Sequence, residues 1–224
     1  MSSLKISKES QQRIRQLQKI YRAKKKEITC RLGEFSECLK EKDEIGIFSE
    51  LAFCLLTPQS KAQCCWNAIR TIDRQNLLLS GTEDDIKGTL RRVRFHNKKA
   101  RYVVGAREQF RNNEGLAIKT VLKNFSDVYE CREWLVKNIA GLGYKEASHF
   151  LRNIGIGNNI AILDRHILRN LVQFSVIREI PPSLGKAQYL QIEGKMSAFA
   201  REIRIPLAHL DLLLWFKETG EIFK

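Results

Sequence analysis

The sequence predicts an all-α protein of two helical domains. The 224 residues include only 4 prolines, and 43% of the residues are hydrophobic, enough to bury a core. Medium-length amphipathic stretches recur along the chain, whereas strand signals are scarce. The length fits one large domain or two small ones that share an interface. We expect a central bundle over residues 46–180 and a second domain built from residues 1–45 and 181–224.

Apolar spacing and capping residues predict the helices in chain order. The first spans residues 8–28, where Leu17 and Tyr21 fall near one face. The second follows Gly46 and ends at LTPQS, where Pro58 breaks it and Ser60 can cap the next helix. Further helices are expected after residue 61, from Thr82 onward, and over residues 98–111, 127–139, 144–153, 164–172, 186–201 and 207–217.

The charge of the chain indicates a polyanionic partner. Lys and Arg number 39 against 25 Asp and Glu, which gives a formal net charge of +14 and a pI near 9.7. Nucleic acid is the leading candidate, and a merely basic protein is the alternative. No segment reaches the ~20 apolar residues of a membrane span, and the first residues are too polar for a signal peptide. We expect no membrane association and a cytoplasmic location with the chromosome, in the nucleoid.

The cysteines do not predict a metal site or a disulfide. There are 6 cysteines, no pair has CxxC spacing, and none follows Cys131. An intracellular chain with this pattern is expected to carry reduced, partly buried thiols. The sequence therefore predicts no cofactor and no metal ligands.

The segment RRVRFHNKKAR, residues 91–101, is a candidate DNA-binding loop. It holds six basic residues and no acidic one, with Phe95 at its middle. Such a loop could neutralise phosphates and stack on a base. A solvated loop with one buried anchor fits the composition equally well.

A helix–hairpin–helix is predicted at about residues 131–154. A helix ends at Gly141-Leu-Gly143, and a second helix begins at once with Tyr144. Glycines permit positive φ and leave backbone N–H groups uncovered, so that a helix N-terminus there can hold a phosphate. Gly141, Gly143 and Tyr144 would thus grip the DNA backbone, and Ala147 is small where the two helices would cross.

Lys145 and Asp164 are the candidate catalytic pair. Lys145 lies in the first turn of the hairpin's second helix, where the helix dipole disfavours an ammonium; a neutral lysine can attack an electrophilic carbon and form a Schiff base. Asp164, 19 residues later, could stabilise a cationic sugar. The ordinary alternatives are a phosphate contact or solvated charge for Lys145 and a helix cap for Asp164.

GLGYKEASHFLRN followed by AILDRHILRNL closely resembles the helix–hairpin–helix DNA glycosylases, and specifically the archaeal-type 8-oxoguanine DNA glycosylase/lyases. LAFCLLTPQS, RFHNKKARYVV and DLLLWFKETGEIFK are similar to further segments of that family. The resemblance implies two helical domains with the DNA-binding cleft between them. It implies a monomer that binds double-stranded DNA containing 8-oxoguanine, flips out and excises the base, and cleaves the strand by β-elimination.

The resemblance also assigns residues. Lys145 matches the lysine of bifunctional enzymes, and Asp164 matches the shared catalytic aspartate. Phe95 and Trp215 match the pair that sandwiches the flipped base, and Lys224 matches a final lysine whose carboxylate reads the guanine edge. His149 and Asp211 fall in matching regions and are interpreted as orienting the site; a satisfied helix-face histidine and a helix N-terminal carboxylate are the ordinary alternatives.

Some features depart from the family or leave rivals open. The GIGNN loop is slightly long, a length that would move Asp164 relative to the hairpin, and the N-terminal region matches no motif. The four cysteines of the related iron–sulfur branch are missing after Asp164, so no iron–sulfur cluster is expected. A structural cation bound by the hairpin carbonyls would need no cysteines and stays open as an alternative. The rivals are a glycosylase for oxidised pyrimidines, which the missing cysteines and Lys224 disfavour, and a non-catalytic hairpin module that only binds DNA.

Overall fold

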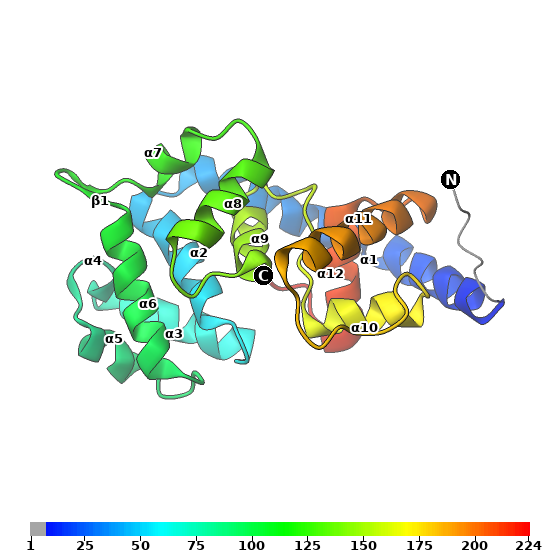
Figure 1. The fold of residues 1–224 in the computed structure, drawn as a ribbon, viewed down its shortest axis with the longest axis horizontal. Helices are drawn as coiled ribbons and strands as arrows, with labels where there is room; N and C mark the ends of the chain where they lie inside the picture. The colour runs from blue at the N-terminus through cyan, green and yellow to red at the C-terminus, as the bar shows by residue number, and fades with distance from the viewer. Residues whose placement is uncertain (1–7) are drawn as a thin grey trace. The chain divides into compact units, whose positions relative to one another are not determined.

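The computed structural model describes residues 8–224 and is built almost entirely of helices (Figure 1). This confirms the all-α prediction; the only strands in the described residues form one two-stranded ribbon. The chain divides into two compact units. We call residues 35–157 the hairpin unit, and residues 8–34 with 158–224 the terminal unit.

The hairpin unit is assembled around one buried helix. Ten residues of α2, from Ile47 to Leu56, are buried, and α3, α6, α7 and α9 all pack against it (Figure 1). The elements of this unit after α1 are α2 (Glu44–Leu56), α3 (Ala62–Arg74), α4 (Leu77–Ser80), α5 (Glu83–Thr89), α6 (His96–Gln109), β1 (Arg111–Asn112), β2 (Gly115–Leu116), α7 (Ile118–Lys123), α8 (Val128–Asn138) and α9 (Tyr144–Asn153). Because α2 is mostly apolar and is buried over ten of its 13 residues, it forms the core to which the other helices attach.

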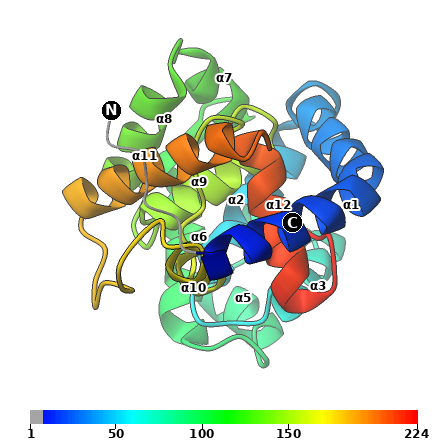
Figure 2. The ribbon, with the colours of Figure 1, turned by 90° about the vertical axis from the view of Figure 1, so that its right-hand side faces the viewer.

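The terminal unit combines helices from both ends of the chain. Within it α12 packs against both α10 and α11, and Figure 2 shows α11 beside α12. Its elements are most of α1 (Lys8–Glu41), α10 (Arg165–Gln173), α11 (Lys186–Glu202) and α12 (Leu207–Thr219). Buried hydrogen bonds fix the extended segment before α10, since Glu193 accepts from Ala161 N at 2.7 Å and Tyr189 Oη donates to Ala161 O at 2.7 Å.

The division differs from the predicted boundaries at 45/46 and 180/181. Residues 158–180, expected in the central bundle, group with the terminal unit because α10 packs on α12. The end of α1 groups with the hairpin unit, since the Arg152 guanidinium lies 5.0 Å from the Phe35 ring centroid. Helix α1 also runs 13 residues beyond its predicted end at residue 28, because Phe35 and Cys38 continue its buried face.

Local capping signals were partly informative. Thr82 and Asp85 form a reciprocal capping box at the start of α5, as their spacing predicts. Ser60 was expected to cap the helix after Pro58, and this was wrong. The N-cap of α3 is Lys61, while Ser60 Oγ accepts a hydrogen bond from Arg94 N at 3.0 Å. The serine thus joins two segments 34 residues apart instead of closing a helix end.

Candidate active site

Lys145 lies in the first turn of α9, at the start of the hairpin's second helix. Its Nζ is 3.3 Å from Thr57 Oγ1 and 3.5 Å from Glu146 Oε1, and the side chain is 23% exposed. The Thr57 hydroxyl donates its proton to Cys54 O at 2.8 Å, so the lone pairs of Oγ1 accept from the lysine. The Lys145 amine is thus hydrogen-bonded to the Thr57 hydroxyl and remains accessible from solvent.

The turn before α9 depends on its first glycine. Gly141 has φ +85°, a left-handed conformation that L side chains rarely adopt. A Cβ there would also lie 2.2 Å from the Tyr102 ring, so both backbone conformation and steric overlap exclude a side chain at this position. The sequence suggested a positive φ at both glycines of the turn. Gly143 instead has a φ of −91°, which is ordinary extended backbone. As the N-cap of α9, Gly143 offers no side-chain acceptor to the first-turn N–H groups. An anion at this helix end would meet backbone donors and the positive end of the helix dipole.

Other contacts fix the two helices of the hairpin. Tyr144 Oη donates to Glu133 Oε1 at 2.5 Å, and the Arg132 guanidinium lies 5.4 Å from the Tyr144 ring. Arg132 is 1% exposed and donates to Ser148 Oγ at 3.0 Å. Ala147 is fully buried where α8 packs on α9, as expected for a crossing point. The helix–hairpin–helix predicted over residues 131–154 is therefore present.

Phe95 is a large exposed hydrophobic side chain beside a cluster of basic residues. It is 52% exposed, adopts a left-handed backbone conformation with φ 59°, and is the N-cap of α6. The Arg94 guanidinium lies 5.8 Å from its ring. The segment 91–101 was expected to be a basic loop that leads into a helix from residue 98. Helix α6 begins two residues earlier, at His96, and Lys99 and Ala100 start its buried face. An uncovered ring at a helix start suits stacking on a base.

His149 belongs to the packed interior of the hairpin unit. It lies one turn after Lys145 on α9, is 6% exposed and contacts the Phe53 ring edge-to-face at 5.6 Å. The buried contact with Phe53 fits the alternative in which His149 is a packed helix-face residue, as well as a role in orienting the site.

In the terminal unit, Asp164 is the N-cap of α10, as its position predicts. Its Oδ1 accepts from Ile167 N at 2.8 Å, and the residue is half-buried. Two residues later the His166 ring meets the Trp215 ring edge-to-face, with centroids 5.3 Å apart. Asp164 and Trp215 are thus linked through the packing of α10 on α12.

Asp211 and Lys224 lie on and after the last helix. Asp211 is 6% exposed and lies in the second turn of α12, beyond the first turn to which the helix N-terminal alternative refers. Gly220, with φ 78°, ends α12, and the tail of residues 221–224 leads to a half-buried Lys224.

The candidate residues divide between the two units. Phe95, Lys145 and His149 belong to the hairpin unit with the glycine turn, whereas Asp164, Asp211, Trp215 and Lys224 belong to the terminal unit. Two further polar residues near Lys145 were not predicted, Thr57 and Lys99. Thr57 carries a weak signal in the LTPQS turn that follows α2. Lys99 carries none, because a basic segment does not reveal which lysine is buried.

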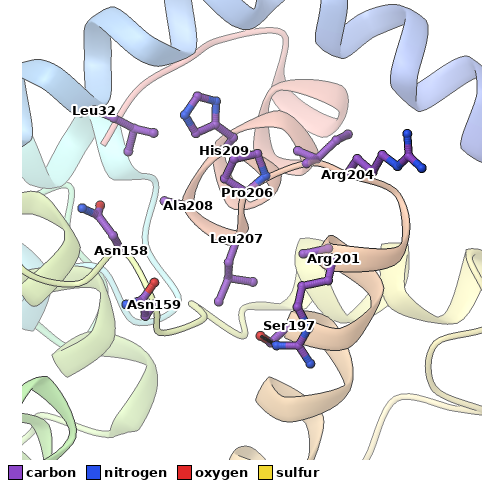
Figure 3. A pocket seen from close by; sticks show the side chains of 12 residues that line it. Leu32, Asn158, Asn159, Ser197, Arg201, Arg204, Pro206, Leu207, Ala208 and His209 are labelled. Carbon is purple, nitrogen blue, oxygen red and sulfur yellow. Dashed lines mark hydrogen bonds between the residues drawn. The ribbon is translucent and has the colours of Figure 1, made fainter. Parts of the chain in front are cut away.

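The terminal unit also contains a cavity of about 640 Å³ at the start of α12, shown in Figure 3. Its polar lining consists of Asn158, Asn159, Ser197, Arg201, Arg204 and His209. Burial, and secondarily the charge of Lys25, lowers the pKa of His209, whose Nδ1 lies 3.1 Å from Tyr21 Oη. None of the candidate catalytic or base-recognition residues lines this cavity.

Among residues 8–224, no group of three or more His, Cys, Asp or Glu side chains could hold a metal ion. Burial raises the pKa of the Cys65 thiol to about 11 and that of Cys131 to about 12, so both remain protonated near neutral pH. In the same part of the chain, no helix has the length and apolar character needed to cross a membrane.

Comparison with known proteins identifies the family. Residues 28–205 match the model of the 8-oxoguanine DNA glycosylase family with the helix–hairpin–helix. The chain is 46% identical over 209 residues to the 8-oxoguanine DNA glycosylase/AP lyase of Fusobacterium nucleatum, covering 93% of this chain and 96% of that protein. It is 40% identical over 197 residues to that of Methanocaldococcus jannaschii, covering 88% and 91%.

Solved structures agree with this assignment. The crystal structure of the Methanocaldococcus jannaschii enzyme matches with a TM-score of 0.85 and 35% identity, over 96% of this chain and 97% of that one. The same enzyme in complex with a 15mer DNA containing 8-oxoguanine matches with a TM-score of 0.85 and 35% identity, over 94% and 99%. The chain therefore belongs to the 8-oxoguanine DNA glycosylase family.

Proposed function

We propose that the chain is a bifunctional 8-oxoguanine DNA glycosylase and AP lyase. It binds double-stranded DNA that contains 8-oxoguanine, excises the damaged base and then cleaves the strand at the abasic site. The relatives in Fusobacterium and Methanocaldococcus carry both activities in their names, and one relative is solved with DNA containing this lesion. We infer that it acts as a monomer on chromosomal DNA.

Lys145 is the proposed nucleophile. Its neutral amine attacks C1′ of the damaged nucleotide, a C1′–N bond to the lysine forms, and the bond from C1′ to the base breaks. The electron pair of that bond leaves with the base, which takes up a proton. Opening of the sugar ring gives a Schiff base between Lys145 and C1′, and loss of a C2′ proton expels the 3′ phosphate. Water then releases the lysine.

Asp164 is the proposed partner of the lysine. Its carboxylate stabilises positive charge on the deoxyribose while the glycosidic bond breaks and assists the proton movements that follow. In its N-cap role Oδ1 accepts from Ile167 N. The other carboxylate oxygen is then the one that would face the sugar.

The remaining candidates hold the substrate. Phe95 and Trp215 stack on the two faces of the flipped base, Lys224 reads its edge, and His149 and Asp211 orient the pocket. Extruding the nucleotide costs a few kcal/mol of unstacking, which stacking on these two rings offsets. Gly141, Gly143 and Tyr144 hold the DNA backbone beside the lesion.

The observation that carries the proposal is the accessible Lys145 amine in the first turn of α9, on a Thr57 hydroxyl and beside a glycine turn. A module that only binds DNA needs the turn but not this amine.

A panel of duplexes tests the function. Each contains 8-oxoguanine, an oxidised pyrimidine or an abasic site, opposite each of the four bases. We expect release of 8-oxoguanine with strand cleavage, cleavage of the abasic duplex, and little release of the oxidised pyrimidine. Preferential release of the pyrimidine would support the rival enzyme, and binding without release or cleavage would support the non-catalytic module.

A further inference from the structure

Lys99 is a buried lysine that the proposed mechanism leaves unused. It lies on α6, one turn after Phe95, and is 3% exposed. Lysines are almost never this buried unless their charge is paired. Here Nζ donates to Leu56 O at 2.6 Å, to Pro58 O at 2.7 Å and to Ser60 Oγ at 3.0 Å. Three acceptors match the three N–H groups of an ammonium, so the buried group is satisfied.

All three acceptors belong to the turn between α2 and α3, residues 56–60. Leu56 O lies at the C-terminal end of α2, where carbonyls lack helical partners and the helix dipole favours a cation. Cys65 Sγ donates to the same carbonyl at 3.1 Å. Within the turn Gln59 has φ 55°, a left-handed conformation that is strained for a residue other than glycine. A strained backbone persists only where its surroundings hold it, and Lys99 supplies three of the bonds that do so.

The same turn carries the hydrogen-bond partner of Lys145. Thr57 Oγ1 accepts from Lys145 Nζ at 3.3 Å and is fixed in turn by its bond to Cys54 O. The two residues on either side of Thr57, Leu56 and Pro58, both present their carbonyls to Lys99. Movement of these carbonyls would therefore displace the hydroxyl that holds the lysine amine.

The turn is also bonded to the backbone next to Phe95. Ser60 Oγ, which accepts from Lys99 Nζ, accepts from Arg94 N at 3.0 Å. The main-chain N–H of Lys99 donates to Phe95 O at 3.1 Å. Lys99 thus contacts the left-handed Phe95 through its backbone and the preceding residue through Ser60.

We propose that Lys99 is a positioning residue that sets the place of both Lys145 and Phe95 through the turn of residues 56–60. Removing its ammonium frees the turn, so that Thr57 no longer fixes the amine and Ser60 no longer fixes the backbone before Phe95. The inference rests on the proposed function, because it concerns residues assigned to the reaction.

The test uses Lys99→Met, which keeps the length of the side chain and removes the ammonium. The measurement is the single-turnover rate of borohydride trapping on an abasic-site duplex, at saturating protein and per folded molecule. Loss of bonds from a charged group predicts a rate at least about tenfold lower than wild type. Lys119→Met is the matched control, since Lys119 Nζ also donates to a main-chain carbonyl of the hairpin unit, Lys42 O at 2.7 Å. We expect this control to trap at the wild-type rate.

A double-mutant cycle separates positioning from general support. If Lys99 acts through Thr57, then adding Lys99→Met to Thr57→Val lowers the trapping rate by less than about twofold beyond the slower single variant. Full additivity of the two effects would overturn the inference, as would a Lys99→Met variant that traps at the wild-type rate.

Ser60→Ala decides the matter if Lys99→Met does not fold. This variant removes one acceptor of Lys99 and the partner of Arg94 N, and it should slow excision of 8-oxoguanine severalfold; unchanged excision would overturn the inference. Failure of the wild-type protein itself to trap would count against the proposed function, and the two failures are therefore distinguishable.

Discussion

Lys145 Nζ lies 3.3 Å from Thr57 Oγ1, a hydroxyl at the end of a helix 88 residues earlier in the chain. Since the Thr57 proton is donated to Cys54 O, the hydroxyl can only accept from the lysine. This bond gives the amine a fixed starting position, which matters because misplacement of a reacting group costs rate steeply.

Thr57→Val keeps the shape of the side chain and removes the acceptor. If this bond positions the nucleophilic amine, its loss predicts a trapping rate about tenfold lower on abasic-site DNA. The control is Thr71→Val, since Thr71 Oγ1 likewise donates to a carbonyl one turn earlier, Asn67 O at 3.1 Å, but on an exposed part of α3. Equal rates for wild type and Thr57→Val would show that the hydroxyl does not position the amine.

Gly141→Ala introduces a Cβ at positive φ and against the Tyr102 ring. We expect the free energy of unfolding to fall by about 1–3 kcal/mol, the usual range for such strain, and affinity for undamaged duplex DNA to fall with it. Urea denaturation and fluorescence anisotropy measure the two effects.

Gly105→Ala provides a control of opposite sign. Gly105 lies within α6, and a Cβ there meets nothing within 4 Å. Replacing a helical glycine by alanine should stabilise the protein by roughly 0.5–1 kcal/mol without changing DNA affinity. If Gly141→Ala behaved like Gly105→Ala, the assigned turn geometry would be incorrect.

Phe95→Ala should separate base recognition from strand cleavage. Because the ring is 52% exposed, stability should change by less than about 0.5 kcal/mol. Stacking is worth about 1–3 kcal/mol per base, so excision of 8-oxoguanine should slow by at least about fivefold. Cleavage of a ready-made abasic site should remain near the wild-type rate. Leu79→Ala, at a 37% exposed position of the same unit, should affect neither activity. Equal losses in both reactions would argue against a stacking role.

The free energy of unfolding at alkaline pH should depend on the lowered pKa of the buried Lys99. Burial lowers its pKa from 10.5 to about 8, with the charges of Cys65, Lys145, Glu146 and Arg94 acting secondarily in both directions. Between these values the unfolded chain binds more protons at this residue than the folded protein does. The free energy of unfolding therefore gains a contribution as the pH rises from 8 to 10.5.

Lys99→Met isolates that contribution. Urea denaturation at pH 7.5 and 10 gives the difference in unfolding free energy between wild type and variant at each pH. We expect this difference to move in favour of wild type at pH 10, by at most about 3 kcal/mol. A difference that does not depend on pH, or that moves the other way, would contradict a lowered pKa for Lys99.

Sequence patterns predicted the features that depend on local chemistry. The hairpin turn, the cap at Asp164 and the capping box at Thr82 follow from residues close together in the chain, and each is present. The short helices α4 and α7 and the β1–β2 ribbon were not predicted, because segments of two to six residues carry little periodicity.

Features that depend on distant segments were missed. Ser60 was interpreted as a cap because it follows Pro58, but its partner is Arg94 N, which only the packing of α6 against α2 brings close. Lys99 is one of 39 basic residues, and nothing in RRVRFHNKKAR distinguishes it from the lysine before it. Tertiary packing alone decides which of them is buried.

Borohydride trapping of Lys145 on a duplex containing 8-oxoguanine is the most direct test of the proposed chemistry. Wild-type protein should form a covalent adduct whose tryptic peptide carries the sugar on Lys145. Lys145→Gln should form none, while Lys137→Gln, at an exposed position on α8, should trap normally. Absence of an adduct with the wild-type protein, or an adduct of undiminished yield with Lys145→Gln, would contradict the lysine mechanism.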